Sequence, residues 1–148
     1  MQENMLQVKI NGKEKTYREG TRYLDIALEF QKEEDSKIVL ASVNGKLKEL
    51  KKKVKEGDHV TFLTLKDKNG FMTYRRSMIL LMLKAIYTVG GFDLVDRVGI
   101  HYSVGDGFYV TIAGMNHIES SFLSQVEKEM REMVDKKLPI TKTSVSTD

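Results

Sequence analysis

The chain has 148 residues, 41% of them hydrophobic, which is enough to build one ordinary domain or two small ones and argues against wholesale disorder. The segment up to Lys66 contains 14 Lys and Arg against 11 Asp and Glu, whereas from Asp67 onward the counts are 10 and 10, so the excess positive charge of +3 lies in the first half. There is no cysteine, which excludes disulfides and thiolate metal sites and fits a reducing compartment. No signal peptide is visible at Met1–Gln7, and we expect a cytoplasmic protein with no membrane partner.

The first 66 residues predict a small module rich in strands. Apolar and polar residues alternate over 5–10, Asn11-Gly12 is a strong hairpin-turn signal, and 13–18 supplies the second strand. We expect a helix from Arg22 to about Gln31, capped by Thr21. The residues expected to face inward on this helix are Leu24, Ala27, Leu28 and Phe30.

Three further strands are expected in this half. They are 37–43, a short strand near Leu47 that follows the turn Asn44-Gly45, and 59–65. The order hairpin, helix, strand, short strand, strand is that of the ubiquitin-like β-grasp, in which a sheet wraps around one helix.

The same stretch resembles a TGS domain, the β-grasp module of threonyl-tRNA synthetases, stringent-response enzymes and some GTPases. The resemblance spans nearly all of 5–65, and we assign 1–66 to this domain. It implies a binding or regulatory module, often near RNA or nucleotides. The landmarks are Asn11-Gly12, Glu19-Gly20-Thr21, Asp25-Ile26-Ala27, Val43-Asn44-Gly45 and Glu56-Gly57-Asp58.

A lysine run in this domain is the residue-level support for an anionic partner. The candidate nucleic-acid-binding residues are Lys51, Lys52, Lys53 and Lys55, which follow Lys46 and Lys48. Phosphate contacts require only such positive charge. The alternative, a solvated cluster that protects a sheet edge, is the commoner outcome, and no aromatic residues interleave to indicate base stacking.

The second half predicts a helix, a hairpin and another helix. After a polar connector, 66–70, a helix is expected over 72–89; it is apolar on all sides around 78–83, which predicts burial on every side. Strands are expected over 98–104 and 108–113. Strict alternation puts Val98, Ile100, Tyr102 and Val104 on one side of the first strand and His101 on the other.

The last expected helix runs from His117 to about Lys136 and is capped by Asn116. Leu138-Pro139-Ile140 ends it, with a final strand as one option after it. The apolar stripe of this helix is Ile118, Phe122, Val126, Met130, Met133 and Val134.

The segments GIHYSVGDGFYV and VEKEMREMVDKKLPITK, placed after a TGS-like domain, are similar to the second N-terminal domain of threonyl-tRNA synthetases. That domain edits mischarged tRNA with a His-x-x-x-His pair on its central helix and a later Cys and His. Here Ser77 and Leu81 stand in place of the pair, and the later ligands are missing. We therefore expect 67–148 to be a degenerate, truncated editing-like α+β domain without catalytic residues or a metal site.

A related resemblance is to bacterial uridine kinase-like proteins, which carry the same domain in front of a P-loop kinase domain. Its residues are Tyr74-Arg75-Arg76-Ser77, His101-Tyr102-Ser103 and Asp106-Gly107-Phe108-Tyr109. No G-x-x-x-x-G-K-[ST] is present, so ATP and Mg are expected only with a kinase domain outside this sequence, and no cofactor is expected within it.

Any ligand is expected in the old editing cleft, near Arg75, Arg76, His101 and Tyr109. The two arginines either hold a phosphate or carboxylate or pair with nearby aspartates. His101 points either into a cleft or to solvent, and Tyr102, Phe108 and Tyr109 are interpreted as residues that pack in the core and in the hairpin.

Two functions follow from these patterns. The first is a non-catalytic regulatory or ligand-binding region of a uridine kinase-like, ATP-dependent nucleoside kinase, with its own C-terminal kinase domain as partner. The alternative is an RNA-binding accessory fragment related to the threonyl-tRNA synthetase N-terminus, with Lys51–Lys55 against tRNA phosphates. Nucleotide and tRNA are the candidate ligands.

Overall fold

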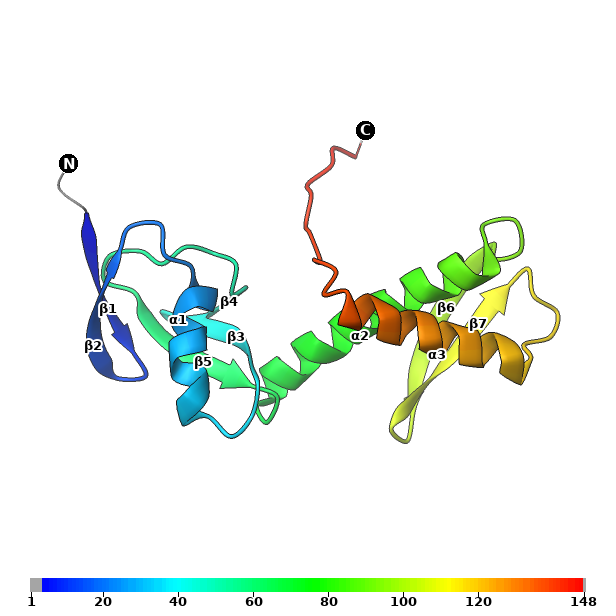
Figure 1. Cartoon of the computed structure of the whole chain (residues 1–148), viewed down its shortest axis with the longest axis horizontal. Helices are drawn as coiled ribbons and strands as arrows, with labels where there is room; N and C mark the ends of the chain where they lie inside the picture. The colour runs from blue at the N-terminus through cyan, green and yellow to red at the C-terminus, as the bar shows by residue number, and fades with distance from the viewer. Residues whose placement is uncertain (1–3, 148) are drawn as a thin grey trace. The chain divides into compact units, whose positions relative to one another are not determined.

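The computed structural model describes residues 4–147 and forms two compact units, with the division between Ser77 and Met78 (Figure 1). The first unit contains a five-stranded sheet, one α-helix and a short 3-10 turn. Its elements are β1 (Met5–Ile10), β2 (Lys13–Arg18), α1 (Tyr23–Phe30), η1 (Gln31–Glu33), β3 (Ile38–Val43), β4 (Lys46–Lys48) and β5 (His59–Thr64).

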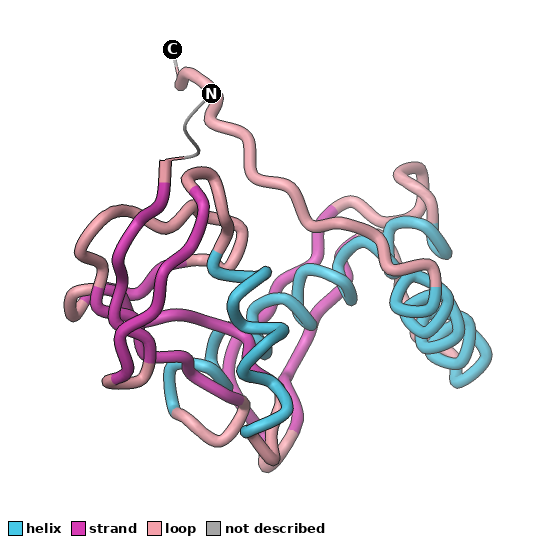
Figure 2. Tube along the Cα trace, turned by 60° about the vertical axis from the view of Figure 1, so that its left-hand side comes forward, coloured by secondary structure: helices cyan, strands magenta, loops and turns pink. Residues whose placement is uncertain are grey.

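The sheet has the strand order β2-β1-β5-β3-β4, with β1 and β5 parallel at its centre and every other pair antiparallel. Helix α1 lies along one face of this sheet (Figure 2). Apolar side chains from alternate strand positions meet the buried side of α1 in one core, which includes Ile10, Ile26, Ala41, Val43 and Val60. This is the β-grasp arrangement, and it confirms the predicted fold of the first half.

Both Asn-Gly turns are present, and their side chains tie strands together. Asn11 and Asn44 adopt φ values of 48° and 51°, and the glycines that follow also have positive φ, the conformation that tight hairpin turns require. The Asn11 side-chain Oδ1 accepts a hydrogen bond from the Phe62 amide at 3.2 Å, and the Asn44 Oδ1 accepts one from the His59 amide at 2.9 Å. Each turn therefore also fixes β5.

Helix α1 differs from expectation at its start and on one face. Arg22, not Thr21, is the N-cap, because the Asp25 carboxylate accepts the Arg22 amide at 3.1 Å while the Thr21 hydroxyl donates to the Arg18 carbonyl. Leu28 is exposed, so its predicted inward orientation is wrong. Tyr23 and Ile26 fill the core in its place.

Helix α2 (Lys68–Gly90) contains the division between the units. It begins within the predicted connector. The Asp67 carboxylate accepts a hydrogen bond from the Thr64 amide at 2.6 Å, and the Asp67 backbone carbonyl accepts one from the Phe71 amide at 2.8 Å. The prediction that this helix is buried on every side is wrong. Leu80 is 50% exposed, and Ala85 and Ile86 are the buried apolar residues of the helix.

The remaining elements are β6 (Arg97–Val104), β7 (Gly107–Ala113) and α3 (Ser120–Asp135). Ala85 and Ile86 pack with Val95, Ile112, Val126 and Met133 in the core of the second unit. Glu119 is the N-cap of α3, so the predicted Asn116 cap is wrong by three residues. Val134 is exposed, and no strand follows Pro139 within the described residues.

Candidate functional site

The lysine run forms the most basic surface segment of the first unit. Residues 46–55 contain six lysines and one glutamate, and Lys51, Lys52, Lys53 and Lys55 are all exposed. Within residues 4–147, no carboxylate lies within ion-pair distance of Lys52, Lys53 or Lys55. These charges are thus available to an external anion.

The backbone of this segment is anchored to the start of α1. The Lys52 carbonyl accepts the Tyr23 amide at 3.0 Å, and the Leu50 carbonyl accepts the Leu24 amide at 2.7 Å. Val54 is buried in the core, and its amide donates to the Thr21 carbonyl at 2.9 Å. The lysines therefore project from a fixed backbone, which lowers the entropy that a bound ligand must remove.

A buried carboxylate fixes the end of the same segment. Asp58 is 3% exposed and accepts hydrogen bonds from the Tyr23 hydroxyl at 2.6 Å, the Lys55 amide at 2.8 Å and the Asn44 side-chain amide at 3.1 Å. Burial, the hydrogen bond to Asp58 and the charge of that carboxylate together raise the pKa of Tyr23 well above its ordinary value. The Lys48 ammonium lies 3.5 Å from the same hydroxyl, so this lysine is committed to the network.

The hairpin of the second unit brings together two predicted site residues. His101 and Tyr109 have ring centroids 5.5 Å apart, and the His101 Nε2 atom lies 2.8 Å from the Thr111 hydroxyl. Tyr102 stacks on Tyr109 with centroids 5.2 Å apart. Both tyrosines are exposed, so neither is a core residue, whereas their stacking on each other agrees with the predicted packing within the hairpin.

A β-bulge explains why Tyr102 joins this cluster. Ile100 pairs with Val110 and Ser103 pairs with Phe108, so His101 and Tyr102 lie opposite the single residue Tyr109. The extra residue interrupts the alternation. Tyr102 consequently shares the side of Tyr109 and not that of Val98, which alternation had predicted.

Arg75 and Arg76 lie on α2 in the first unit, whereas His101 and Tyr109 belong to the second, so a shared site of these four residues stays a prediction. The Ser77 hydroxyl donates to the Thr73 carbonyl one turn earlier on the helix, at 3.2 Å.

Leu81 lines a mainly apolar hollow of about 370 Å³ in the second unit, together with Met78, Met130 and Val134. Leu81 has no metal-binding atom, and the Ser77 hydroxyl is engaged with the Thr73 carbonyl. Within residues 4–147, no cluster of three or more His, Cys, Asp or Glu side chains is placed to hold a metal ion.

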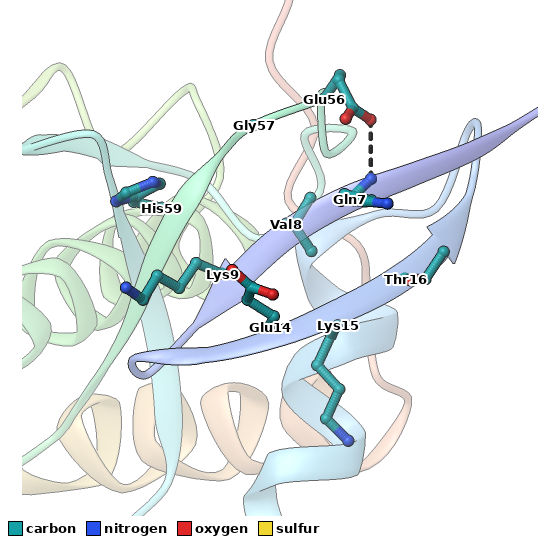
Figure 3. A pocket seen from close by; sticks show the side chains of 9 residues that line it. All are labelled: Gln7, Val8, Lys9, Glu14, Lys15, Thr16, Glu56, Gly57 and His59. Carbon is teal, nitrogen blue, oxygen red and sulfur yellow. Dashed lines mark hydrogen bonds between the residues drawn. The ribbon is translucent and has the colours of Figure 1, made fainter.

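A shallow hollow of about 550 Å³ lies on the sheet of the first unit (Figure 3). Lys9 and Glu14 face each other across β1 and β2, and Glu56 accepts the Gln7 amide at 2.8 Å. The charged side chains that line the hollow have both signs, and some of them already pair or hydrogen-bond within the sheet, so the hollow shows no preference for an anion.

Among the helices of residues 4–147, none combines the length and apolar character that crossing a bilayer demands.

Comparison with known proteins identifies the first unit. Residues 9–64 match the family model described as "TGS domain", which confirms the predicted TGS domain.

The whole chain is similar to several proteins named threonine–tRNA ligase. It is 28% identical to that of Thermotoga neapolitana and 29% identical to that of Thermotoga maritima over 139 residues, which is 93% of this chain and 21% of each relative. The identity to the Oceanobacillus iheyensis protein is 26% over 136 residues. The chain thus spans about a fifth of the length of these relatives. The similarity extends through both units and favours the alternative hypothesis, the accessory fragment, over the uridine kinase-like context.

Proposed function

We propose that this chain is an RNA-binding accessory module and that its TGS domain binds the phosphates of tRNA through the lysine segment 46–55. The observation that carries the proposal is the anchored backbone of this segment, which displays Lys52, Lys53 and Lys55 with no carboxylate partner among residues 4–147. Similarity over 93% of the chain to ligases that act on tRNA supports RNA as the anion.

The physical mechanism is charge neutralisation with release of counterions. A lysine that neutralises a phosphate displaces a condensed cation, so the affinity falls as salt rises. Each lysine lost from such an interface lowers the slope of log affinity against log salt by about 1. The proposed contact is therefore measurable as a slope and does not require knowledge of the RNA sequence.

The test measures binding of fluorescently labelled tRNA by anisotropy at several salt concentrations. Replacement of Lys52, Lys53 and Lys55 with glutamine should weaken binding and reduce the salt slope by about 3. A matched control replaces Lys32, Lys37 and Lys68, which are also exposed and belong to the same unit. If both triple variants lose affinity and slope equally, binding is non-specific and the proposal fails.

The uridine kinase-like hypothesis makes a different prediction. If the chain is a regulatory region of a nucleoside kinase, uridine or its phosphates should raise the melting temperature, since a ligand that binds only the folded state stabilises it. Substitution of Arg75 and Arg76 should remove that shift. The relatives described above favour RNA, so we expect no shift with nucleosides.

A further inference from the structure

We propose that the outer surface of the β6–β7 hairpin is a stacking platform for an unpaired RNA base, centred on Tyr102. This inference rests on the proposed RNA-binding function but uses a different surface and a different interaction. The platform consists of Tyr102, Tyr109, His101 and Thr111.

Strand pairing separates the two surfaces of the hairpin. Val98 pairs with Ile112 and Ile100 with Val110, and Val98, Val110 and Ile112 belong to the core of the second unit. The residues that alternate with them, which include Thr111 and Tyr109, face away from this core. The bulge adds both His101 and Tyr102 to that outer surface.

The two tyrosine rings of the platform are stacked on each other and are still largely exposed to solvent. Tyr102 is 62% exposed and Tyr109 47% exposed, yet the two rings are stacked at an interplanar angle of 18°. Tyr109 lies against the Tyr102 ring, and the exposed fraction of Tyr102 leaves ring surface for a ligand. An exposed cluster of large apolar groups is informative because soluble proteins rarely leave one without a use.

A hydrogen bond and a glycine hold the cluster in place. The bond between the His101 ring and the Thr111 hydroxyl crosses the two strands at 2.8 Å. Gly99 leaves room for it, since a Cβ there would lie 2.9 Å from both His101 Nε2 and Thr111 Oγ1. The rings are thus pre-oriented, which favours a planar ligand.

The charge of this surface matches a nucleotide. Arg97 precedes Gly99 by two residues and is exposed on the same side of β6, and no acidic residue occupies an outward position on either strand. A cation on the same strand surface as stacked rings suits single-stranded RNA, a combination used on other β-sheet surfaces that bind it. Double-stranded RNA offers no accessible base face, so the platform should select unpaired nucleotides.

The test uses the 148-residue chain and three labelled RNAs: a 12-nucleotide oligouridine, a 12-nucleotide oligoadenine and a 12-base-pair duplex. Tyr102→Ala should weaken binding of the single strands about tenfold, a loss typical of a stacking aromatic, and should leave the salt slope unchanged. Tyr102→Phe should bind like the parent, because stacking needs the ring and not the hydroxyl. A 2-aminopurine in the oligonucleotide should be quenched by the parent and by Tyr102→Phe but not by Tyr102→Ala.

Phe92→Ala is the control, because Phe92 is an 83% exposed aromatic of the same unit outside the hairpin. The inference is overturned if Tyr102→Ala weakens single-strand binding no more than Phe92→Ala does, or if duplex binding falls equally. It is also overturned if Tyr102 instead supports a dimer in analytical ultracentrifugation. If lysine substitutions flatten the salt slope while Tyr102 proves neutral, the proposed function stands and this inference alone fails.

Discussion

The Tyr23–Asp58 hydrogen bond should be a major determinant of the stability of the TGS domain. Tyr23→Phe removes the buried hydroxyl that donates to Asp58 at 2.6 Å, together with its weaker 3.5 Å contact to the Lys48 ammonium. A hydrogen bond to a charged group contributes about 1.5–3 kcal/mol. Asp58 keeps the Lys55 and Asn44 donors after the substitution, so we expect a loss of about 2 kcal/mol in the free energy of unfolding.

The assay is urea denaturation followed by NMR, with amide signals of β1 and β5 as reporters of the first unit. Separate reporters are needed because two compact units need not unfold in one transition. Tyr17→Phe is the matched control: it removes a hydroxyl bonded to Glu29 at 3.0 Å near the surface and should cost less than about 1 kcal/mol. If the two substitutions cost the same, Asp58 is not the fixed acceptor described above and the reasoning is refuted.

Two further predictions concern pH and helix burial. Burial and the hydrogen bond to Glu29 raise the pKa of Tyr17 from 10.0 to about 12, so the folded chain keeps a proton that the unfolded chain releases above pH 10. The stability of the folded chain should therefore fall as pH rises from about 10 to about 12, and thermal melts at successive pH values should show a smaller decline for Tyr17→Phe. An unchanged decline would contradict the raised pKa of Tyr17. In α2, Ile86→Ala should cost about 2–4 kcal/mol because Ile86 is buried, whereas Leu80→Ala should cost less than about 1 kcal/mol in urea melts of the second unit; equal costs would contradict the burial pattern.

The turns and strands of the first unit could be predicted because their signals are local. Asn11-Gly12 and Asn44-Gly45 adopt positive φ as their residue types favour, and the alternation over 5–10 matches β1. Tyr23 was missed as a core residue because its burial depends on Asp58, a partner 35 residues away in sequence. No local pattern reports such a partner.

The candidate surfaces were predictable to different degrees. The lysine run is visible in composition, but its anchoring depends on bonds from Lys52 and Leu50 to the start of α1. Tyr102 was assigned to the wrong side because its segment alternates perfectly and the bulge is a property of pairing with β7. The apolar run of α2 indicated a helix correctly, yet apolar composition alone did not reveal that Leu80 is half exposed.

The central position of β1 and β5 has a consequence for how the TGS domain is made. These strands are the first and the last of the sheet in sequence, yet they pair with each other through Lys9–His59 and Ile10–Val60. Such pairing over a long sequence separation slows folding, because the intervening chain must be closed before the contact forms. During synthesis the domain cannot complete its sheet until β5 has left the ribosome, and until then β1 can pair only with β2.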